Sequence, residues 1–233
     1  MRDFLKKIFH KRSSHIKTPI IDSWTNSSNY WENRYVSGGN SGIGSYGRLA
    51  QFKADVINQF VRENNIQKII EWGCGDGNQL SLAAYPQYIG FDVSKEAIAI
   101  CQKKFIGDKA KQFIYCGSDN FSTKHTAELT LSLDVLYHLI EDEVYETYMR
   151  RLFETSTRYV CIYSCNDEKT TNAQHVKHRK FTDWIDIYAK EWRMIRIIKN
   201  RYPYSPDVPE SSWSDFYFYE KQNYNKNNEK VPS

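Results

Sequence analysis

Apolar residues recur along this chain in two patterns, and together they predict an α/β fold. Short apolar runs predict strands, and between them lie segments whose apolar positions recur every three to four residues, as in helices. The strands are expected at 68–72, 87–92, 112–116, 128–135, 158–164, 192–199 and 215–220. The helices are expected at 49–61, 79–84, 94–105, 141–156 and 182–191. Strands alternating with helices predict a parallel sheet with right-handed crossovers.

The last two strands are close together in the sequence, with a proline-containing loop between them, so they predict an antiparallel hairpin at the sheet edge. The fold class expected is therefore α/β, a doubly wound and mostly parallel seven-stranded sheet with a C-terminal hairpin. With 233 residues the chain is long enough for one such domain and short for two. The domain is placed at 30–221, between a basic arm at 1–29 and a polar tail at 222–233 expected to be disordered.

Three alternating glycines follow the first strand. Glu71 lies near the end of that strand, and Gly73, Gly75 and Gly77 form a turn that lets a ligand approach the main chain. A dinucleotide fingerprint has a different spacing, G-x-G-x-x-G, and places a pyrophosphate at the helix start. An acid before the first glycine would repel a phosphate and attract a cation. The spacing favours S-adenosylmethionine, which has a sulfonium and no phosphate, and disfavours a nicotinamide-dependent oxidoreductase.

A second acid supports this interpretation. Asp92 ends the second strand, about twenty residues further on, where a carboxylate accepts the ribose hydroxyls in a nucleotide-binding βαβ unit. The third strand ends at Gly117, Ser118 and Asp119, and Asp119 is equally typical of a turn or a helix N-cap.

With these residues, the segment 68–160 resembles a class I S-adenosylmethionine-dependent methyltransferase, with 71–77 as its first motif. The resemblance implies a Rossmann-like fold and cofactor contacts at Glu71, Gly73, Cys74, Gly75, Asp92, Val93, Ser118 and Asp119. The chain from 30 to 219 further resembles a bacterial subgroup associated with surface-glycan and modified-sugar pathways. That resemblance rests on the segments 30–35, 38–48 and 134–139.

The segment 30–47 is aromatic and then glycine-rich, with five of the chain's eleven glycines between Gly38 and Gly47. Together with the amphipathic helix that follows, it predicts a mobile lid with its anchoring helix at 30–65. Tyr46 is expected to contact the substrate. Arg48 is expected to reach the methionine carboxylate of the cofactor or an anionic acceptor, with a surface ion pair as the alternative.

The residues after the fourth strand are candidates for chemistry, because parallel sheets bind ligands at the carboxyl ends of their strands. His138 is the first candidate for a general base, with Asp134 as its catalytic neighbour and Tyr137 as a substrate contact. Methyl transfer depends mainly on alignment, and a base helps only where the acceptor is a hydroxyl. The alternative for His138 is a role in orienting a loop or packing the core.

A basic cluster at 175–181 suits an acceptor that bears phosphate, such as a nucleotide sugar. His175, His178 and Arg179 are its predicted substrate contacts, and a solvated basic turn is the alternative. Two histidines with Asp183 nearby make an incomplete ligand set, so no metal is predicted. The five cysteines contain no C-x-x-C pair, which favours reduced thiols. Cys74 is expected to be a small residue that packs in the glycine turn rather than a reactive thiol.

The net charge of +4 is concentrated in residues 1–17, which hold six Lys or Arg against one Asp. The folded domain therefore lacks the basic face expected of a nucleic-acid enzyme. The arm is either a frayed terminus or a short helix that contacts an anionic membrane. No run of about twenty apolar residues and no secretory signal is seen, which predicts a cytoplasmic protein.

The expected activity is methyl transfer from S-adenosylmethionine to an oxygen, or a nitrogen, of a small or glycan-type acceptor in surface-polysaccharide biosynthesis. A non-catalytic partner subunit that binds the same cofactor is the alternative.

Overall fold

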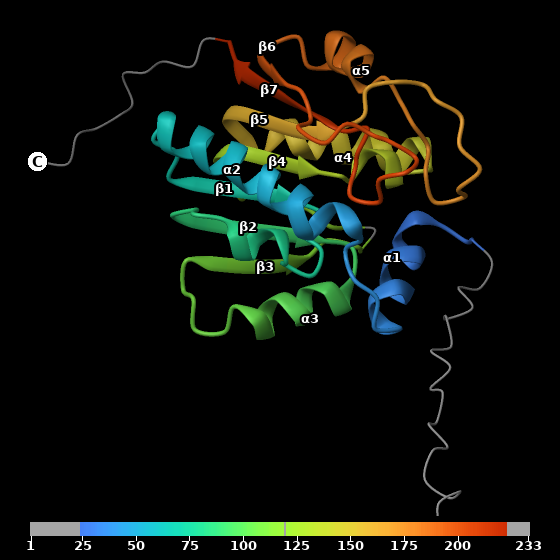
Figure 1. The fold of residues 1–233 in the computed structure, drawn as a ribbon. Coiled ribbons are helices and arrows are strands. Elements are labelled where there is room, and N and C mark those ends of the chain that lie inside the picture. The colour runs from blue at the N-terminus through green and yellow to red at the C-terminus, as the bar shows by residue number, and fades with distance from the viewer. Residues whose placement is uncertain (1–23, 119, 223–233) are drawn as a thin grey trace, which may run out of the picture.

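The computed structural model describes residues 24–118 and 120–222, and within them seven strands form one sheet (Figure 1). The strand order is β3-β2-β1-β4-β5-β7-β6. The strands are β1 Lys68–Trp72, β2 Gln87–Asp92, β3 Lys111–Tyr115, β4 Ala127–Leu133, β5 Ser156–Ser164, β6 Trp192–Ile198 and β7 Asp215–Lys221. β1 to β5 pair in parallel, and β7 runs antiparallel to both β5 and β6. This arrangement confirms the predicted fold, including the C-terminal hairpin.

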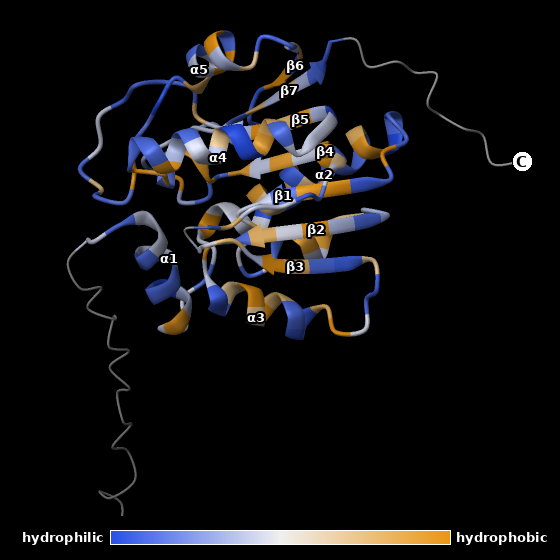
Figure 2. Cartoon of the chain, turned by 180° about the vertical axis from the view of Figure 1, so that it is seen from behind, coloured by the Kyte–Doolittle hydropathy of each residue, from blue (hydrophilic) through white to orange (hydrophobic). Residues whose placement is uncertain are grey.

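Helices cover both faces of the sheet. They are α1 Ser27–Val36, α2 Gly47–Glu63, α3 Lys95–Lys104, α4 Asp142–Glu154 and α5 Phe181–Tyr188, with short 3₁₀ turns η1 Ile43–Ser45, η2 Gln79–Leu82 and η3 Leu136–His138. One core cluster joins α2 and α3 to one face of the sheet, and a second joins α4 and α5 to the other. Figure 2 shows that hydrophobic colours concentrate in the central strands, which are buried between these two layers.

Most boundaries differ from the prediction by one to three residues, and two of the differences have clear local reasons. β4 ends at Leu133, two residues early, because Asp134 adopts a left-handed backbone with φ +59° that no strand continues. α1 begins at Ser27, inside the predicted arm, and its N-cap is Asn26, whose side chain accepts a hydrogen bond from the Asn29 N–H at 2.8 Å. Ser94 is the N-cap of α3, since its Oγ accepts from the Ala97 N–H at 3.0 Å.

The predictions for the arm at 1–17, for Asp119 and for nearly all of the tail concern residues outside the described ones. In the part of the chain that is described, no helix combines the length and the apolar composition needed to cross a bilayer.

Candidate active site

A cavity of about 500 Å³ opens at the carboxyl ends of β1, β2 and β4. This is the sheet edge where α/β proteins bind ligands. Of the residues predicted from the sequence, it is lined by Glu71, Gly73, Cys74, Gly75, Asp92, Val93, Ser118, Asp134 and His138. Further lining residues come from α1, from the segment 41–45 and from α4.

The glycine loop after β1 lies directly under the segment 35–41. Gly75 has φ +56°, and a Cβ atom at this position would lie 2.3 Å from Ser41 Oγ and 2.9 Å from Tyr35 Oη. Both the backbone conformation and the close approach therefore require glycine here.

The two predicted acids line the cavity wall, and the backbone fixes the second of them. Asp92 Oδ2 accepts a hydrogen bond from the Gly75 N–H at 2.8 Å, and Oδ1 accepts from the Ser94 N–H at 2.9 Å. Burial raises the pKa of this carboxyl to about 6. Each carboxylate oxygen accepts more than one hydrogen bond, so Asp92 retains acceptor capacity for a ligand.

Glu71 is 4% exposed and accepts a hydrogen bond from Tyr88 Oη at 2.5 Å. Burial raises its pKa to about 7, while Tyr88 and Lys53 oppose the rise. Glu71 is therefore poised to gain or lose a proton near neutral pH, at the wall of the cavity.

Asp76 joins the glycine loop to the predicted lid. Its Oδ2 accepts hydrogen bonds from the Ser41 N–H at 3.0 Å and from Tyr46 Oη at 2.7 Å, and its own N–H donates to Ser41 Oγ at 2.9 Å. Burial alone would raise the pKa of Asp76. These hydrogen bonds and one from the Asn78 N–H outweigh burial, and the pKa of Asp76 is lowered. Burial and then Asp76 raise the pKa of Tyr46 to about 12. Tyr46, a predicted substrate contact, donates to Asp76 and is not among the residues that line the cavity.

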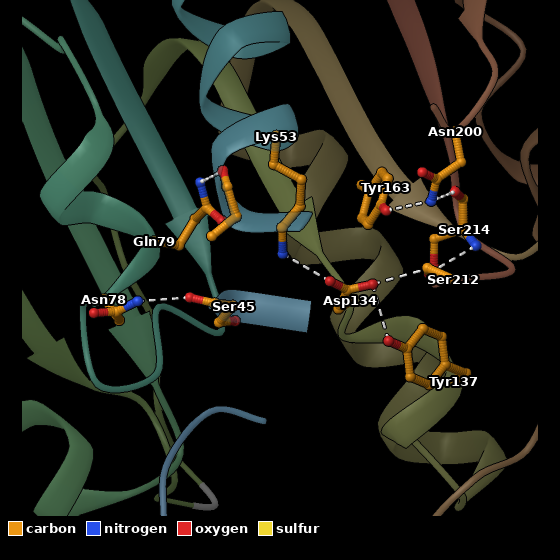
Figure 3. A network of polar contacts seen from close by, with 11 residues as sticks. Ser45, Lys53, Asn78, Gln79, Asp134, Tyr137, Tyr163, Asn200, Ser212 and Ser214 are labelled. Carbon is orange, nitrogen blue, oxygen red and sulfur yellow. Dashed lines mark hydrogen bonds and ion pairs between the residues drawn. The ribbon is translucent and has the colours of Figure 1, made fainter. Parts of the chain in front are cut away.

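Asp134 is the centre of a polar network that joins α2, η3, β5 and the loop before β7 (Figure 3). Its Oδ2 accepts from Lys53 Nζ at 2.7 Å, and its Oδ1 accepts from Tyr137 Oη at 2.9 Å and Ser214 Oγ at 3.1 Å. Its main-chain N–H donates to the Tyr163 carbonyl at 2.9 Å. The predicted residue Tyr137 thus supports Asp134, and it is not among the residues that line the cavity.

His138 lines the cavity and is held from behind. Its Nδ1 lies 2.9 Å from the carbonyl oxygen of His175. A carbonyl only accepts hydrogen bonds, so Nδ1 carries the proton and Nε2 keeps a free lone pair. Loss of water around the ring lowers the pKa of His138 to about 4. The His175 ring stacks on Tyr30 of α1 at 4.8 Å between ring centres, which joins α1 to this loop.

Two predicted arginine contacts have partners elsewhere in the chain and do not line the cavity. The Arg48 Nε donates to the Glu210 carbonyl at 2.8 Å and its guanidinium lies 4.4 Å from the centre of the Tyr202 ring, so the alternative of a surface ion pair describes its position. Arg179 donates to the carbonyl oxygens of Leu139 and Ile140 and pairs with Asp142.

The other predicted substrate histidine, His178, has its Nδ1 2.7 Å from the Sγ of Cys165. Neither His178 nor His175 lines the cavity. Among residues 24–118 and 120–222, no three His, Cys, Asp or Glu side chains converge as a metal site requires.

Sequence reasoning missed much of the cavity wall, and two signals were available. Lys53 is fully buried although it is a lysine, and it lies one turn from Leu49 and one from Ile57 on the apolar face of α2. One side of α4 lines the opposite wall with residues at helical spacing, namely Glu143, Val144, Thr147, Tyr148 and Arg151.

Comparison with known proteins gives matches among solved structures alone, since no family model and no curated protein matches the chain. The N-methyltransferase NodS from Bradyrhizobium japonicum WM9, in complex with S-adenosyl-L-homocysteine, has a TM-score of 0.66 at 14% identity and covers 84% of this chain and 99% of its own. The magnesium protoporphyrin IX methyltransferase ChlM from Synechocystis PCC 6803, with bound S-adenosylhomocysteine, has a TM-score of 0.62 at 16% identity. The match covers 84% of this chain and 98% of ChlM.

The methyltransferase domain of bacterial CtHen1 gives a TM-score of 0.57 at 20% identity, covering 74% of this chain and 100% of that domain. Likeness at such identities bears on the fold, and the acceptors of these enzymes differ from one another. The chain has the seven-stranded Rossmann-like α/β fold that these methyltransferases share.

Proposed function

We propose that this chain is an S-adenosylmethionine-dependent methyltransferase. The observation that carries the proposal is the position of Asp92, which two main-chain N–H groups fix at the cavity wall beside the glycine loop. Structures of the same fold hold S-adenosylmethionine or S-adenosylhomocysteine.

The charges around the cavity fit this cofactor. Five acids line it against two basic residues, Lys53 and Arg151. The acids are Glu71, Asp76, Asp92, Asp134 and Glu143. Such a surface attracts a sulfonium and repels a diphosphate. Asp92 would hold the ribose hydroxyls, with Val93 and Ser118 beside the adenine. When bound, the cofactor supplies an electrophilic methyl group with a neutral thioether as the leaving group.

On the acceptor side, His138 is the residue suited to move a proton. Its low pKa keeps the imidazole neutral at pH 7, and Nε2 is free to accept a proton or a hydrogen bond from a hydroxyl. Asp134 is better described as a positioning residue, because three side chains already donate to its two oxygens.

We therefore propose that the methyl group is transferred to an oxygen of a sugar-type acceptor in surface-polysaccharide biosynthesis. A nitrogen of such an acceptor is the second possibility. Trp31 and Ser28 of α1 support a sugar-type acceptor, since an aromatic ring and a hydroxyl at the cavity suit a polyol surface. A phosphorylated acceptor has less support, because the chain itself uses the donors of Arg179.

Calorimetry with S-adenosylmethionine, S-adenosylhomocysteine and NADH tests the cofactor. We expect micromolar binding of the first two and none of NADH, and we expect Asp92→Ala to weaken both at least tenfold. Labelled cofactor with separate pools of neutral sugars, amino sugars, nucleotide sugars and RNA then tests the acceptor. Labelling confined to RNA would overturn the sugar proposal, and no cofactor binding at millimolar concentration would overturn the activity.

A further inference from the structure

Lys53 is a lysine without solvent-exposed surface, and it is among the residues that line the cavity. Its Nζ lies 2.7 Å from Asp134 Oδ2 and 5.3 Å from the centre of the Tyr163 ring, and within the described residues Asp134 is the one hydrogen-bond acceptor it contacts. An ammonium group has three N–H donors. A buried ammonium with unused donors is costly, which indicates that a ligand acceptor completes its surroundings.

Gln79, beside Lys53, has an unpaired acceptor where Lys53 has unused donors. Its Nε2 donates to the carbonyl of Ala50 at 3.1 Å, in α2 one turn before Lys53 (Figure 3). Because a carbonyl only accepts, this contact fixes the amide orientation and turns Oε1 away from the helix. Gln79 is 7% exposed and lines the cavity, and its Oε1 has no hydrogen-bond partner in the described part of the chain. A buried acceptor of this kind calls for a donor.

We infer that these two side chains bind the α-amino-acid end of the cofactor, Lys53 its carboxylate and Gln79 its amino group. The inference rests on the proposed function and replaces Arg48, the residue expected from the sequence, with Lys53. The segment 41–45 and Asp76 close the same end of the cavity.

The charges favour a zwitterion over a plain anion. Asp134 already balances Lys53, and Glu71 lies close enough for Lys53 to oppose the rise of its pKa. A ligand with a carboxylate or phosphate alone would add a negative charge beside these two acids. An α-amino acid adds none in total, and it supplies both the acceptor that Lys53 lacks and the donor that Gln79 lacks.

The test compares ligands that differ in one group. Calorimetry measures binding of S-adenosylhomocysteine and of its decarboxylated form to the wild type and to Lys53→Met. We expect the wild type to prefer the intact ligand by about 10- to 150-fold, the worth of one hydrogen bond to a charged group. In Lys53→Met this preference falls to within about threefold of unity, because the variant weakens only the ligand that has the carboxylate.

Gln79→Met is tested in the same way with the deaminated ligand, and it should lose the preference for the amino group. 5′-Methylthioadenosine lacks the whole amino-acid end and should bind all variants as it binds the wild type, which shows that the rest of the cavity is intact. Arg62→Met, on the exposed side of α2, is the charge control. Lys53→Met/Asp134→Asn removes both buried charges and serves if the single variant does not fold.

Full preference for the carboxylate in a folded Lys53→Met variant would overturn the inference. A wild type that binds neither S-adenosylhomocysteine nor 5′-methylthioadenosine would instead overturn the proposed function.

Discussion

Tyr46 donates a 2.7 Å hydrogen bond to the carboxylate of Asp76, and this contact ties the glycine-rich segment to the loop that follows β1. The same carboxylate accepts from the main-chain N–H of Ser41. Asn78 adds a second tie, since its Nδ2 donates to the Ser45 carbonyl at 2.7 Å. If this segment acts as the predicted lid, a ligand that enters beneath it requires these contacts to open. Lids that enclose a reaction commonly limit the rate of exchange with solvent.

Tyr46→Phe is expected to loosen the lid without changing the cavity wall. The variant removes one hydrogen bond to a charged group, whose worth is reduced by the partial exposure of Tyr46, so release of S-adenosylhomocysteine should become about threefold to tenfold faster. Stopped-flow displacement measures this rate, and hydrogen exchange of 38–46 should rise in parallel. Tyr188→Phe, at an exposed position in α5, is the control. Unchanged hydrogen exchange of residues 38–46 in Tyr46→Phe would contradict a role for the Tyr46–Asp76 hydrogen bond in holding this segment.

Gly75→Ala is expected to displace the lid from below. The added Cβ would meet Ser41 Oγ at 2.3 Å at a residue with φ +56°. We expect affinity for S-adenosylhomocysteine to fall at least tenfold, and Ser41→Gly in the same chain to recover part of it. Gly107→Ala is the matched control, because Gly107 has φ +87° and a Cβ there would meet nothing within 4 Å. It should lower stability and leave affinity unchanged, and equal losses of affinity in both variants would contradict the steric argument.

Glu71→Gln is expected to stabilise the ligand-free protein at high pH. Burial raises the pKa of Glu71 from 4.5 to about 7, so its contribution to stability is complete below pH 4.5 and is lost as the pH rises through 7. Glutamine keeps an acceptor for Tyr88 and has no charge to lose. The free energy of unfolding should therefore exceed that of the wild type by up to about 3 kcal/mol at pH 8, and by little at pH 4.5.

Urea denaturation at the two pH values measures this difference, with Glu154→Gln, an exposed residue, as the control. Binding of S-adenosylmethionine at pH 8 should weaken in Glu71→Gln, because an acid facing the cation is lost. A variant that gains no stability at pH 8 would show that Glu71 is not held in a costly charged state.

The parts of this molecule that follow from local sequence were predictable. The glycine spacing after β1 and the acid that ends β2 act within a few residues, and the structure has them where the pattern placed them. The wall that we propose to hold the cofactor is built from such signals. The parallel direction of β1 to β5 follows from the alternation of strands and helices.

The parts that depend on distant contacts were not predictable from one sequence. Lys53 pairs with Asp134, 81 residues away, and nothing near either residue in the sequence marks the other. Helical geometry still held a clue, because Arg48 and Lys53 are five residues apart and lie about 140° apart around α2. Lys53 shares the buried face with Leu49 and Ile57, whereas Arg48 faces the loop that contains Glu210.

The role of His138 is tested by its pH profile. Because its pKa is lowered from 6.5 to about 4, its contribution to stability is present above pH 6.5 and is lost as the pH falls toward 4. Nε2 therefore remains unprotonated down to about pH 5. With a hydroxyl acceptor and saturating cofactor, protonation of His138 should therefore cause no fall in kcat between pH 8 and 5.

His138→Gln is expected to lower kcat about 10²- to 10⁴-fold, the usual contribution of a general base, and to leave the KM for S-adenosylmethionine unchanged. Saturating cofactor is needed because Glu71 and Asp92 gain protons over the same range and weaken cofactor binding. His125→Gln is the control, since His125 packs near Phe91 and does not line the cavity. A loss in kcat below threefold in His138→Gln would exclude proton transfer to Nε2 and favour an acceptor that needs no base, such as an amine.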